Sequence, residues 1–394
     1  MKSTTVDFTR YFSLQIAIIK FYKMWFFIPH SVKTVWFWVD ILTKIVLGTL
    51  VFFVPTATQL IYAIKLFMVG NPEIHEIAGI INLVLTELLG SLRLLDLFLR
   101  RDMLIQLSDQ LMIRASFRQK KCIATMYTKK ILYFVISVHV VVVPGMQKFL
   151  VLPLKMDFIW IDITEDKYFN YALAYQISYK PMMVTIFIAL QTLPWAAMSF
   201  AISQLDVLIY NLENMKEHIK ATIAERNCDE NTAFKEVFKG CVLHHCSIMR
   251  FVNTLQFVFG GQLTATLFLM GAIIGTTAIQ IFSIESPLKN ITGVAWVLAY
   301  LSIFICILFI DCYFGNSVTV KCMHVSTVVC ASPWMNWPTS LKKSLVLFIA
   351  KTQQPIVIFA AKFVPVSLET FTKVFVYENW GAGSSPAGFL IFQL

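Results

Sequence analysis

Charged side chains are scarce in this 394-residue chain: Asp, Glu, Lys and Arg make up 14%, whereas 57% of the residues are hydrophobic. The mean hydropathy of +0.69 exceeds what a soluble domain can hide in its interior. GxSxG, HExxH, Walker and dinucleotide-binding patterns are all missing, which leaves catalysis and cofactor binding without candidate residues. The composition therefore indicates a membrane protein that is not an enzyme.

Seven apolar segments make up most of the chain. They cover residues 35–64, 77–99, 131–152, 181–205, 251–284, 290–310 and 356–377. Because about 20 apolar residues cross the hydrocarbon core of a bilayer, each segment is long enough for one transmembrane helix. The predicted fold class is an all-α integral membrane protein with seven transmembrane helices. No cleavable signal peptide is expected, since the apolar stretch 11–19 is short and no small-residue cleavage site follows it.

The basic residues fix the expected orientation. The N-terminal arm and the second, fourth and sixth loops hold 23 of the 33 Lys and Arg, whereas six lie in or beside the other three loops. Cytoplasmic loops carry the excess of positive charge, so we expect a cytoplasmic N-terminus and an outward C-terminus. The net charge of +10 then fits anionic membrane lipid and not nucleic acid. The sequon at Asn290 falls in an outward loop and is a candidate glycosylation site. None of the eight cysteines lies in an outward loop, so reduced thiols are expected.

The fourth loop, residues 206–250, is expected to be helical. Apolar residues recur at three- and four-residue spacing from Val207 to Ile223, with charged residues between them, as an amphipathic helix requires. Segment five would measure about 51 Å as a helix, against about 30 Å of hydrocarbon core. Segments four and five are therefore predicted to continue as cytoplasmic helices that pack on each other and join near residues 227–231.

The other expected divisions follow from these segments. A cytoplasmic arm covers residues 1–34, segments one to four cover 35–205, and segments five and six cover 251–312. A cytoplasmic loop and helix at 313–355 precede segment seven at 356–380, and the remaining tail covers 381–394.

Several charged residues lie inside the predicted segments. Asp40 and Lys44 are four residues apart and are expected to neutralise each other near a helix end. Arg93 and Asp96 favour a structural ion pair, whereas Glu87 is deep enough to keep a proton-relay hypothesis open. The His and Cys residues at 241–246 match no metal-ligand spacing, so no metal site is expected.

Segment seven carries charge at membrane depth. Lys362, Glu369, Thr370 and Lys373 would trace one side of a helix that is otherwise apolar. A charge at the bilayer centre costs about 2.5 to 3.5 kcal/mol unless its face lines water. The pattern favours a pore-lining helix, with a charged stripe buried between helices of one subunit as the alternative.

The last third of the chain carries a set of short motifs in a recognisable order. They are Tyr-Phe-Gly at 313–315, Trp337, Lys-Lys-Ser-Leu at 342–345, Lys-Thr-Gln-Gln-Pro at 351–355, Ala-Ala-Lys-Phe at 360–363 and Val-Ser-Leu-Glu-Thr-Phe at 366–371. With the inverted topology and the chain length, this order resembles the insect odorant receptors. The resemblance implies an odorant-gated, non-selective cation channel in the plasma membrane of sensory neurons. Four subunits would surround one pore, and the 45-residue fourth loop resembles that of a tuning subunit that assembles with a co-receptor into a heterotetramer.

The resemblance also implies site residues. A volatile odorant would bind in the outer half of segments two, three, four and six, where an apolar, aromatic and Met-rich cavity suits it. The candidates, for which ordinary bundle packing is the alternative, are His139, Val143, Met146, Met182, Met183, Phe187, Trp296 and Tyr300. The helices that continue segments four to seven would make the subunit contacts, with Trp337, Lys342, Lys343, Gln354 and Pro355 as candidates.

The end of the chain departs from the resemblance, and two alternatives stay open. Residues 381–386 read Gly-Ala-Gly-Ser-Ser-Pro, which should break a helix, so no gate residues are transferred. A G-protein-coupled receptor would let Cys122 and Cys228 pair outside, but it contradicts the charge count. A gustatory receptor shares the inverted topology and usually has a different C-terminal ending.

Overall fold

The computed structural model describes residues 13–22, 35–70, 73–100, 103, 107, 166–284, 291–332, 339–354 and 356–381. In chain order the elements are α1 (Ser13–Phe21), α2 (Val35–Gly48), the π-helical turn η2 (Thr49–Phe53), α3 (Val54–Val69), α4 (Ile74–Leu99), α7 (Asp166–Glu213), α8 (Met215–Arg226), α9 (Glu230–Phe282), α10 (Ile291–Ala331), α11 (Thr339–Thr352), β1 (Phe359–Ala360), β2 (Val364–Pro365) and α12 (Leu368–Gly381). The predicted third segment and Asn290 lie outside the described residues.

Five described helices are long and apolar enough to cross a membrane. They cover Trp38–Met68, Ile74–Leu99, Tyr168–Glu213, Glu230–Phe282 and Gly293–Ala331. They correspond to predicted segments one, two, four, five and six, which confirms an all-helical, multi-pass membrane fold. Segment seven differs from its prediction, because α12 has 14 residues and a length of about 21 Å.

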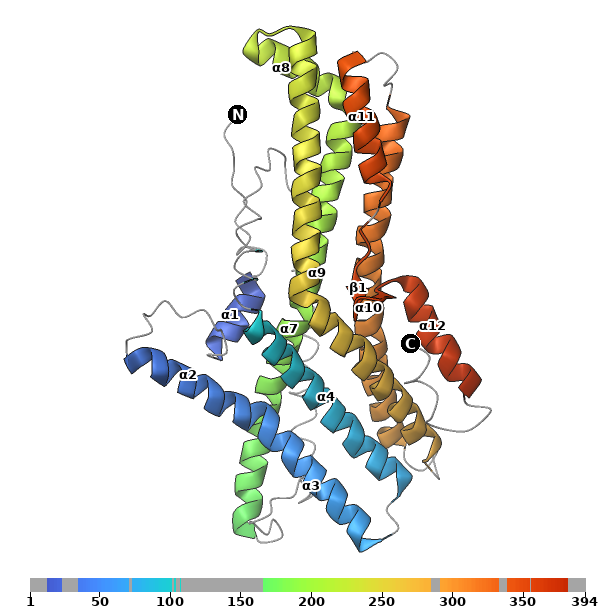
Figure 1. Cartoon of the computed structure of the whole chain (residues 1–394). Coiled ribbons are helices and arrows are strands. Elements are labelled where there is room, and N and C mark those ends of the chain that lie inside the picture. The colour runs from blue at the N-terminus through green and yellow to red at the C-terminus, as the bar shows by residue number, and fades with distance from the viewer. Residues whose placement is uncertain are drawn as a thin grey trace.

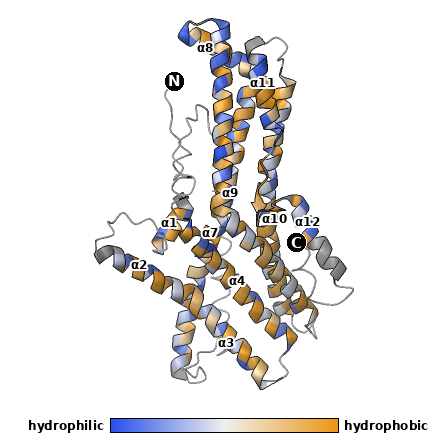
Figure 2. Cartoon of the chain, in the orientation of Figure 1, coloured by the Kyte–Doolittle hydropathy of each residue, from blue (hydrophilic) through white to orange (hydrophobic). Residues whose placement is uncertain are grey.

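Helices α7, α9 and α10 run from the membrane bundle to a distant end where α8 and α11 lie (Figure 1). With 53 residues, α9 is about 80 Å long, so much of it extends beyond a bilayer core. Blue, hydrophilic residues become frequent toward the α8 end (Figure 2). The predicted continuation of segments four and five as packed helices is therefore confirmed.

A short turn joins α8 to α9 at the distant end. Asn227 adopts the left-handed conformation that ends α8, with φ at 50°. Asp229 caps α9 by accepting the N–H of Thr232 at 3.1 Å. Hydrogen bonds from Thr232 hold the pKa of the Asp229 carboxyl below its usual value.

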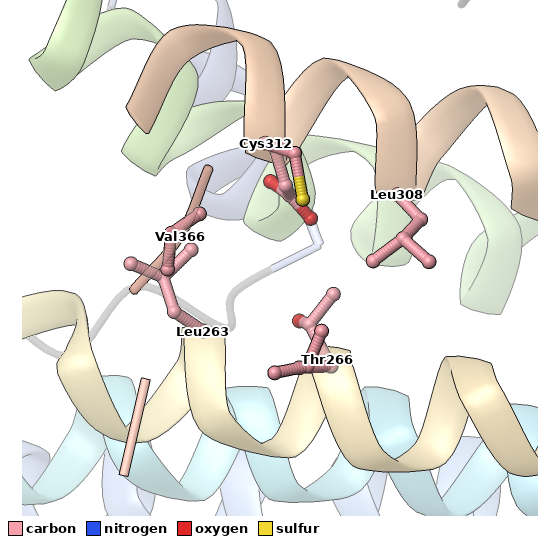
Figure 3. A pocket seen from close by; sticks show the side chains of 7 residues that line it. Leu263, Thr266, Leu308, Cys312 and Val366 are labelled. Atoms are coloured by element: carbon pink, nitrogen blue, oxygen red, sulfur yellow. The ribbon is translucent and has the colours of Figure 1, made fainter. Parts of the chain in front are cut away.

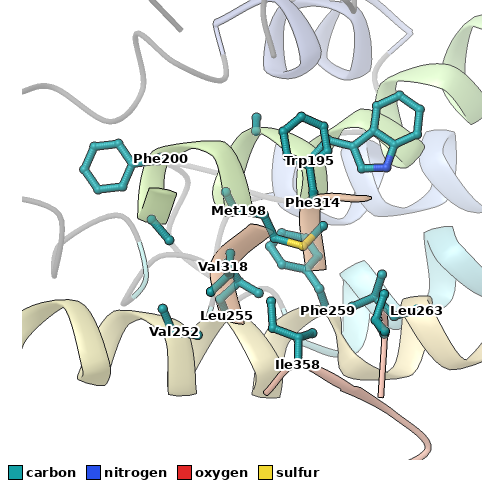
Figure 4. Close-up of a cluster of buried hydrophobic side chains, with 14 of the residues drawn as sticks. Trp195, Met198, Phe200, Val252, Leu255, Phe259, Leu263, Phe314, Val318 and Ile358 are labelled. Carbon is teal, nitrogen blue, oxygen red and sulfur yellow. The ribbon is translucent and has the colours of Figure 1, made fainter. Parts of the chain in front are cut away.

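Helix α7 is the central element of the fold. It continues through Pro181 and Pro194 without interruption. Of the residues in its most apolar 18-residue stretch, 89% are buried, against 11% for the corresponding stretch of α10. Prolines are tolerated in membrane helices where neighbouring helices satisfy the freed backbone groups. Pro194 has no N–H to donate to the Leu190 carbonyl, which instead accepts from Gln262 Nε2 on α9 at 2.9 Å. The core around α7 includes Trp195, Met198, Phe200, Val252, Leu255, Phe259, Phe314, Val318 and Ile358 (Figure 4).

Candidate functional site

A buried polar cluster lies where α3, α4 and α7 meet. The Glu87 carboxylate is fully buried, and its Oε1 accepts from Lys180 Nζ at 3.1 Å and from Gln59 Nε2 at 3.1 Å. The Thr56 hydroxyl lies 3.3 Å from the other carboxylate oxygen. A carboxylate removed from water needs such partners. Glu87, considered a proton-relay candidate from the sequence, thus belongs to an ion pair with a residue 93 positions away.

A second polar cluster lies on the adjacent part of α4 and links it to α10. The Tyr300 hydroxyl is 2.6 Å from Thr86 Oγ1 and donates to the Asn82 carbonyl at 3.2 Å. The Asn82 side chain continues to α9, where its Nδ2 donates to Gln280 Oε1 at 3.2 Å. Because Thr86 and Glu87 are sequence neighbours, α4 connects both clusters.

The structure describes five of the predicted ligand-site residues, three on α7 and two on α10. Met183 and Phe187 on α7 are buried, Met182 is half-buried, and Tyr300 faces α4 through Thr86. Trp296, one helical turn before Tyr300 on α10, is 51% exposed in the single chain. The other three candidates, His139, Val143 and Met146, lie outside the described residues.

A fully buried arginine lies next to Phe187. Arg93 places its guanidinium 4.5 Å from the centre of the Phe187 ring and donates to Thr266 Oγ1 on α9 at 2.8 Å. It also interacts electrostatically with Asp311 on α10. The predicted pair of Arg93 with Asp96 is wrong, because Asp96 pairs with Arg100 at 2.8 Å. One helical turn separates Asp96 from Arg100, and that spacing was the signal that the sequence offered.

Asp311 is the acidic partner in this core. Its carboxylate accepts from Trp195 Nε1 at 2.5 Å and from Gln191 Nε2 at 3.0 Å. A small cavity beside it is lined by Leu263, Thr266, Leu267, Leu308, Asp311, Cys312 and Val366 (Figure 3). Val366 follows β2, so the charged core of the bundle directly adjoins the segment that leads into α12.

That segment is a β-hairpin. Phe359 pairs with Pro365 and Ala360 with Val364, and the Val366 N–H donates to the Ile358 carbonyl at 2.8 Å. Its turn places Ala361 and Lys362 at φ of 52° and 67°, a left-handed region in which residues other than glycine are uncommon. Since two such residues in succession are unfavourable alone, surrounding contacts must hold the turn.

Side chains of α9 provide those contacts, and the backbone of α10 packs on the other side. The Gln256 amide pairs with the free edge of β1: its Nε2 donates to the Phe359 carbonyl at 2.6 Å, and its Oε1 accepts the Phe359 N–H at 2.8 Å. The Ala361 N–H donates to Thr264 Oγ1. On the other side, a Cβ added at Gly315 would lie 2.3 Å from the Val366 carbonyl oxygen, so only glycine allows α10 to approach this closely.

The predicted pore stripe is therefore corrected. The prediction of a single helix from residue 356 is wrong, because Lys362 lies in the hairpin turn and α12 begins at Leu368. Pro365 explains the difference: it removes an N–H and disfavours a helical conformation for the residue before it. Glu369 and Lys373 do share a face, with a 2.9 Å ion pair and side chains 75% and 62% exposed. Thr370 is buried and donates to the Pro365 carbonyl at 2.6 Å.

Three of the predicted subunit-contact residues lie among the described residues. Lys342 is half-buried and Lys343 exposed on α11, and Gln354 is exposed after it. Trp337 and Pro355 lie outside the described residues. In the part of the chain that the structure describes, no group of three His, Cys, Asp or Glu could hold a metal ion.

Comparison with known proteins decides the family. A statistical model of the seven-transmembrane odorant receptors matches residues 82–376, about three quarters of the chain. The chain belongs to the odorant receptor family. This is a family of receptors and not of enzymes, and membership decides against the G-protein-coupled and gustatory alternatives.

Individual odorant receptors match over shorter stretches. Odorant receptor 42b of Drosophila melanogaster is 25% identical over 164 residues, 42% of this chain and 40% of that receptor. Odorant receptor 22b of the same fly is 30% identical over 158 residues, 40% of this chain and 38% of that receptor. The chain thus matches about two fifths of the length of these curated receptors.

A solved odorant receptor shares the fold over nearly the whole chain. The olfactory receptor OR5 of Machilis hrabei, determined in complex with eugenol, superposes with a TM-score of 0.67. The match covers 94% of this chain and 96% of that one at 14% sequence identity. At this identity the likeness establishes the fold alone.

Proposed function

We propose that this receptor is a tuning-type subunit of an odorant-gated, non-selective cation channel in the plasma membrane of sensory neurons. In this proposal it assembles with a co-receptor subunit around one pore, with its N-terminus in the cytoplasm. The observation that carries the proposal is α12: a helix with an exposed Glu369–Lys373 face, joined through a clasped hairpin to the bundle core. Family membership supplies the odorant as the expected class of stimulus.

The proposed odorant site lies beside α4, between α7 and α10. Met183 and Phe187 offer apolar and aromatic contact, and the Tyr300–Thr86 pair offers one polar anchor. Small-molecule sites are mostly apolar with few placed polar groups, which suits a volatile compound with one hydrogen-bonding group. His139, Val143, Met146, Met182 and Trp296 remain proposed members. The odorant opens the channel only to the extent that it binds the open state more tightly than the closed one.

The proposed pore is lined by α12 helices of several subunits. The exposed Glu369 and Lys373 would face water there, and Lys362 would lie at its inner mouth. Acidic side chains around a pore favour cations. The proposed subunit contacts lie on α11 and its flanks, where Val346 and Leu347 expose apolar surface beside Lys342, Lys343, Gln354, Trp337 and Pro355.

Patch-clamp recording tests the proposal. The receptor is expressed with a co-receptor subunit and exposed to a panel of volatile alcohols, esters and phenols. We expect odour-evoked inward cation current that is lost when this chain is omitted. Surface labelling of an epitope-tagged chain provides the control for expression. If the chain is at the surface with the co-receptor and a broad panel evokes no current, the proposed function is wrong.

Removing one hydroxyl tests the proposed odorant site. Tyr300→Phe keeps the ring and deletes the group that bonds Thr86. A hydrogen bond contributes about 0.5 to 1.5 kcal/mol net, so we expect the half-maximal odorant concentration to change roughly two- to tenfold. Tyr313→Phe, the same change at an exposed position on the same helix, is the matched control. If Tyr300→Phe gave the same dose–response curve as Tyr313→Phe, the proposed odorant site would be wrong.

A further inference from the structure

Two charged residues at the end of α4 hold the backbone of α9. Asp96 Oδ2 accepts the backbone N–H of Gln262 at 3.1 Å, and Arg100 Nη1 donates to the backbone carbonyl of Phe257. The two side chains are tied together by the 2.8 Å bond from Arg100 Nε to Asp96 Oδ1. The Arg100 guanidinium also lies 5.4 Å from the centre of the Phe257 ring. One ion pair thus binds a donor and an acceptor of α9 that are five residues apart.

The clamped part of α9 contains two consecutive glycines. Gly260 and Gly261 lie between the two backbone groups that the ion pair holds. A Cβ at Gly261 would be 2.7 Å from Asp96 Oδ1 and 3.0 Å from Arg100 Nη2, so any larger residue here would displace the side chains of the ion pair. Helices bend where glycine occurs and where side chains bond to the backbone. Figure 1 shows that the upper part of α9 and its lower part run in different directions.

The hairpin before α12 is attached to the same part of α9. Gln256 lies one turn before Gly260 and holds both backbone groups of Phe359. Thr264 lies one turn after Gly260; its hydroxyl donates to the Gly260 carbonyl at 2.7 Å and accepts the Ala361 N–H. The two attachment points of the hairpin therefore lie one turn to either side of Gly260.

We propose that Asp96 and Arg100 are positioning residues that set the bend of α9 and, through Gln256 and Thr264, the position of the hairpin and of α12. Because α4 also carries Thr86, Glu87 and Arg93, the clamp joins the helix of the proposed odorant site to the base of the proposed pore helix. This inference rests on the proposed function for its effect on current. Its structural part, the placement of the hairpin by an ion pair on α4, stands apart from that function.

Currents and surface amounts test the role of the clamp. Asp96→Asn and Arg100→Gln are expressed with the co-receptor, and each current is divided by the surface amount of receptor. We expect the half-maximal odorant concentration or the current per surface receptor to change at least about fivefold, the lower range for coupling between sites. The double variant should change little more than the larger single one, because the residues act as a unit. Glu236→Gln, which breaks the exposed pair with Arg226 near α8, is the matched control.

A chemical readout tests the hairpin without any current. Phe363 at the hairpin is 58% exposed, so Phe363→Cys can be labelled with a thiol reagent, with the same background lacking this cysteine as the blank. We expect Asp96→Asn or Arg100→Gln to change the labelling rate several-fold and Glu236→Gln to leave it unchanged. If the wild-type receptor gives no current, the proposed function is wrong. The labelling rates still show whether Asp96 and Arg100 position the hairpin.

Several results would contradict the proposed role of Asp96 and Arg100. Unchanged labelling rates, or wild-type dose–response and current per receptor in both clamp variants, would overturn the proposal. Where Arg100→Gln fails to reach the surface, Arg100→Lys keeps the charge but loses the forked geometry of the guanidinium. Wild-type behaviour of Arg100→Lys in labelling and current would show that the arginine serves stability only, and would also overturn the proposal.

Discussion

Replacing Arg93 with methionine should remove most of the receptor from the cell surface. The guanidinium is fully buried, donates to Thr266 and stacks on Phe187. Its positive charge compensates the negative charge of the buried Asp311 carboxylate. Removing one member of a buried charge pair leaves the other uncompensated and costs about 3 to 5 kcal/mol. That is a large share of the roughly 5 to 15 kcal/mol that stabilises a folded domain.

Surface biotinylation and the melting temperature in detergent measure this effect. Lys220→Met, the same type of change at an exposed position of α8, should leave both quantities unchanged. Adding Asp311→Asn to Arg93→Met should restore part of the surface amount, since an asparagine can still accept from Trp195 and Gln191 without a charge. A single Arg93→Met variant with wild-type melting temperature and surface amount would show that the buried charges are not coupled.

Gly315→Ala is expected to displace the hairpin that precedes α12. The added Cβ would lie 2.3 Å from the backbone oxygen and 2.9 Å from Cγ1 of Val366. A backbone oxygen cannot rotate away, so α10 and the hairpin must separate, and overpacking of this kind costs typically 1 to 3 kcal/mol, occasionally more. Since Val366 leads into α12, the current per surface receptor should fall by more than the surface amount does.

The control is the same substitution where space is free. A Cβ at Gly271 on α9 meets nothing within 4 Å, and alanine favours a helix over glycine by about 1 kcal/mol. Gly271→Ala should therefore keep or raise the melting temperature, whereas Gly315→Ala lowers it. Equal melting temperatures and equal currents in the two variants would refute the close packing at Gly315.

The helices were largely predictable because their cause is local. Apolar runs such as 251–284 and the spacing from Val207 to Ile223 show which residues leave water, and the observed α7, α8 and α9 follow from that. The sequence pattern underestimates the length of segment four, since it predicts a start at Pro181, whereas α7 begins at Asp166. Packing on all sides of α7 outweighs the local effect of its prolines.

The hairpin and the polar clusters were not predictable in the same way. Charge spacing suggested one helix from residue 356, while Pro365 was the contrary signal within the segment. Lys180 and Glu87, or Gln256 and Phe359, are partners only because the tertiary fold brings together residues about 100 positions apart. Hydropathy carries no information on such pairs, and the same holds for the buried partners of Asp311.

The central position of α7 has a consequence for biosynthesis. Its Gln191 finds an acceptor on α10, its Gln204 a partner on α9, and its Leu190 carbonyl accepts from Gln262 of α9. The ribosome completes α7 before either partner helix exists, so these polar groups gain their partners only when α9 and α10 have been made. A nascent chain that ends before α10 would leave the Gln191 amide without its acceptor Asp311.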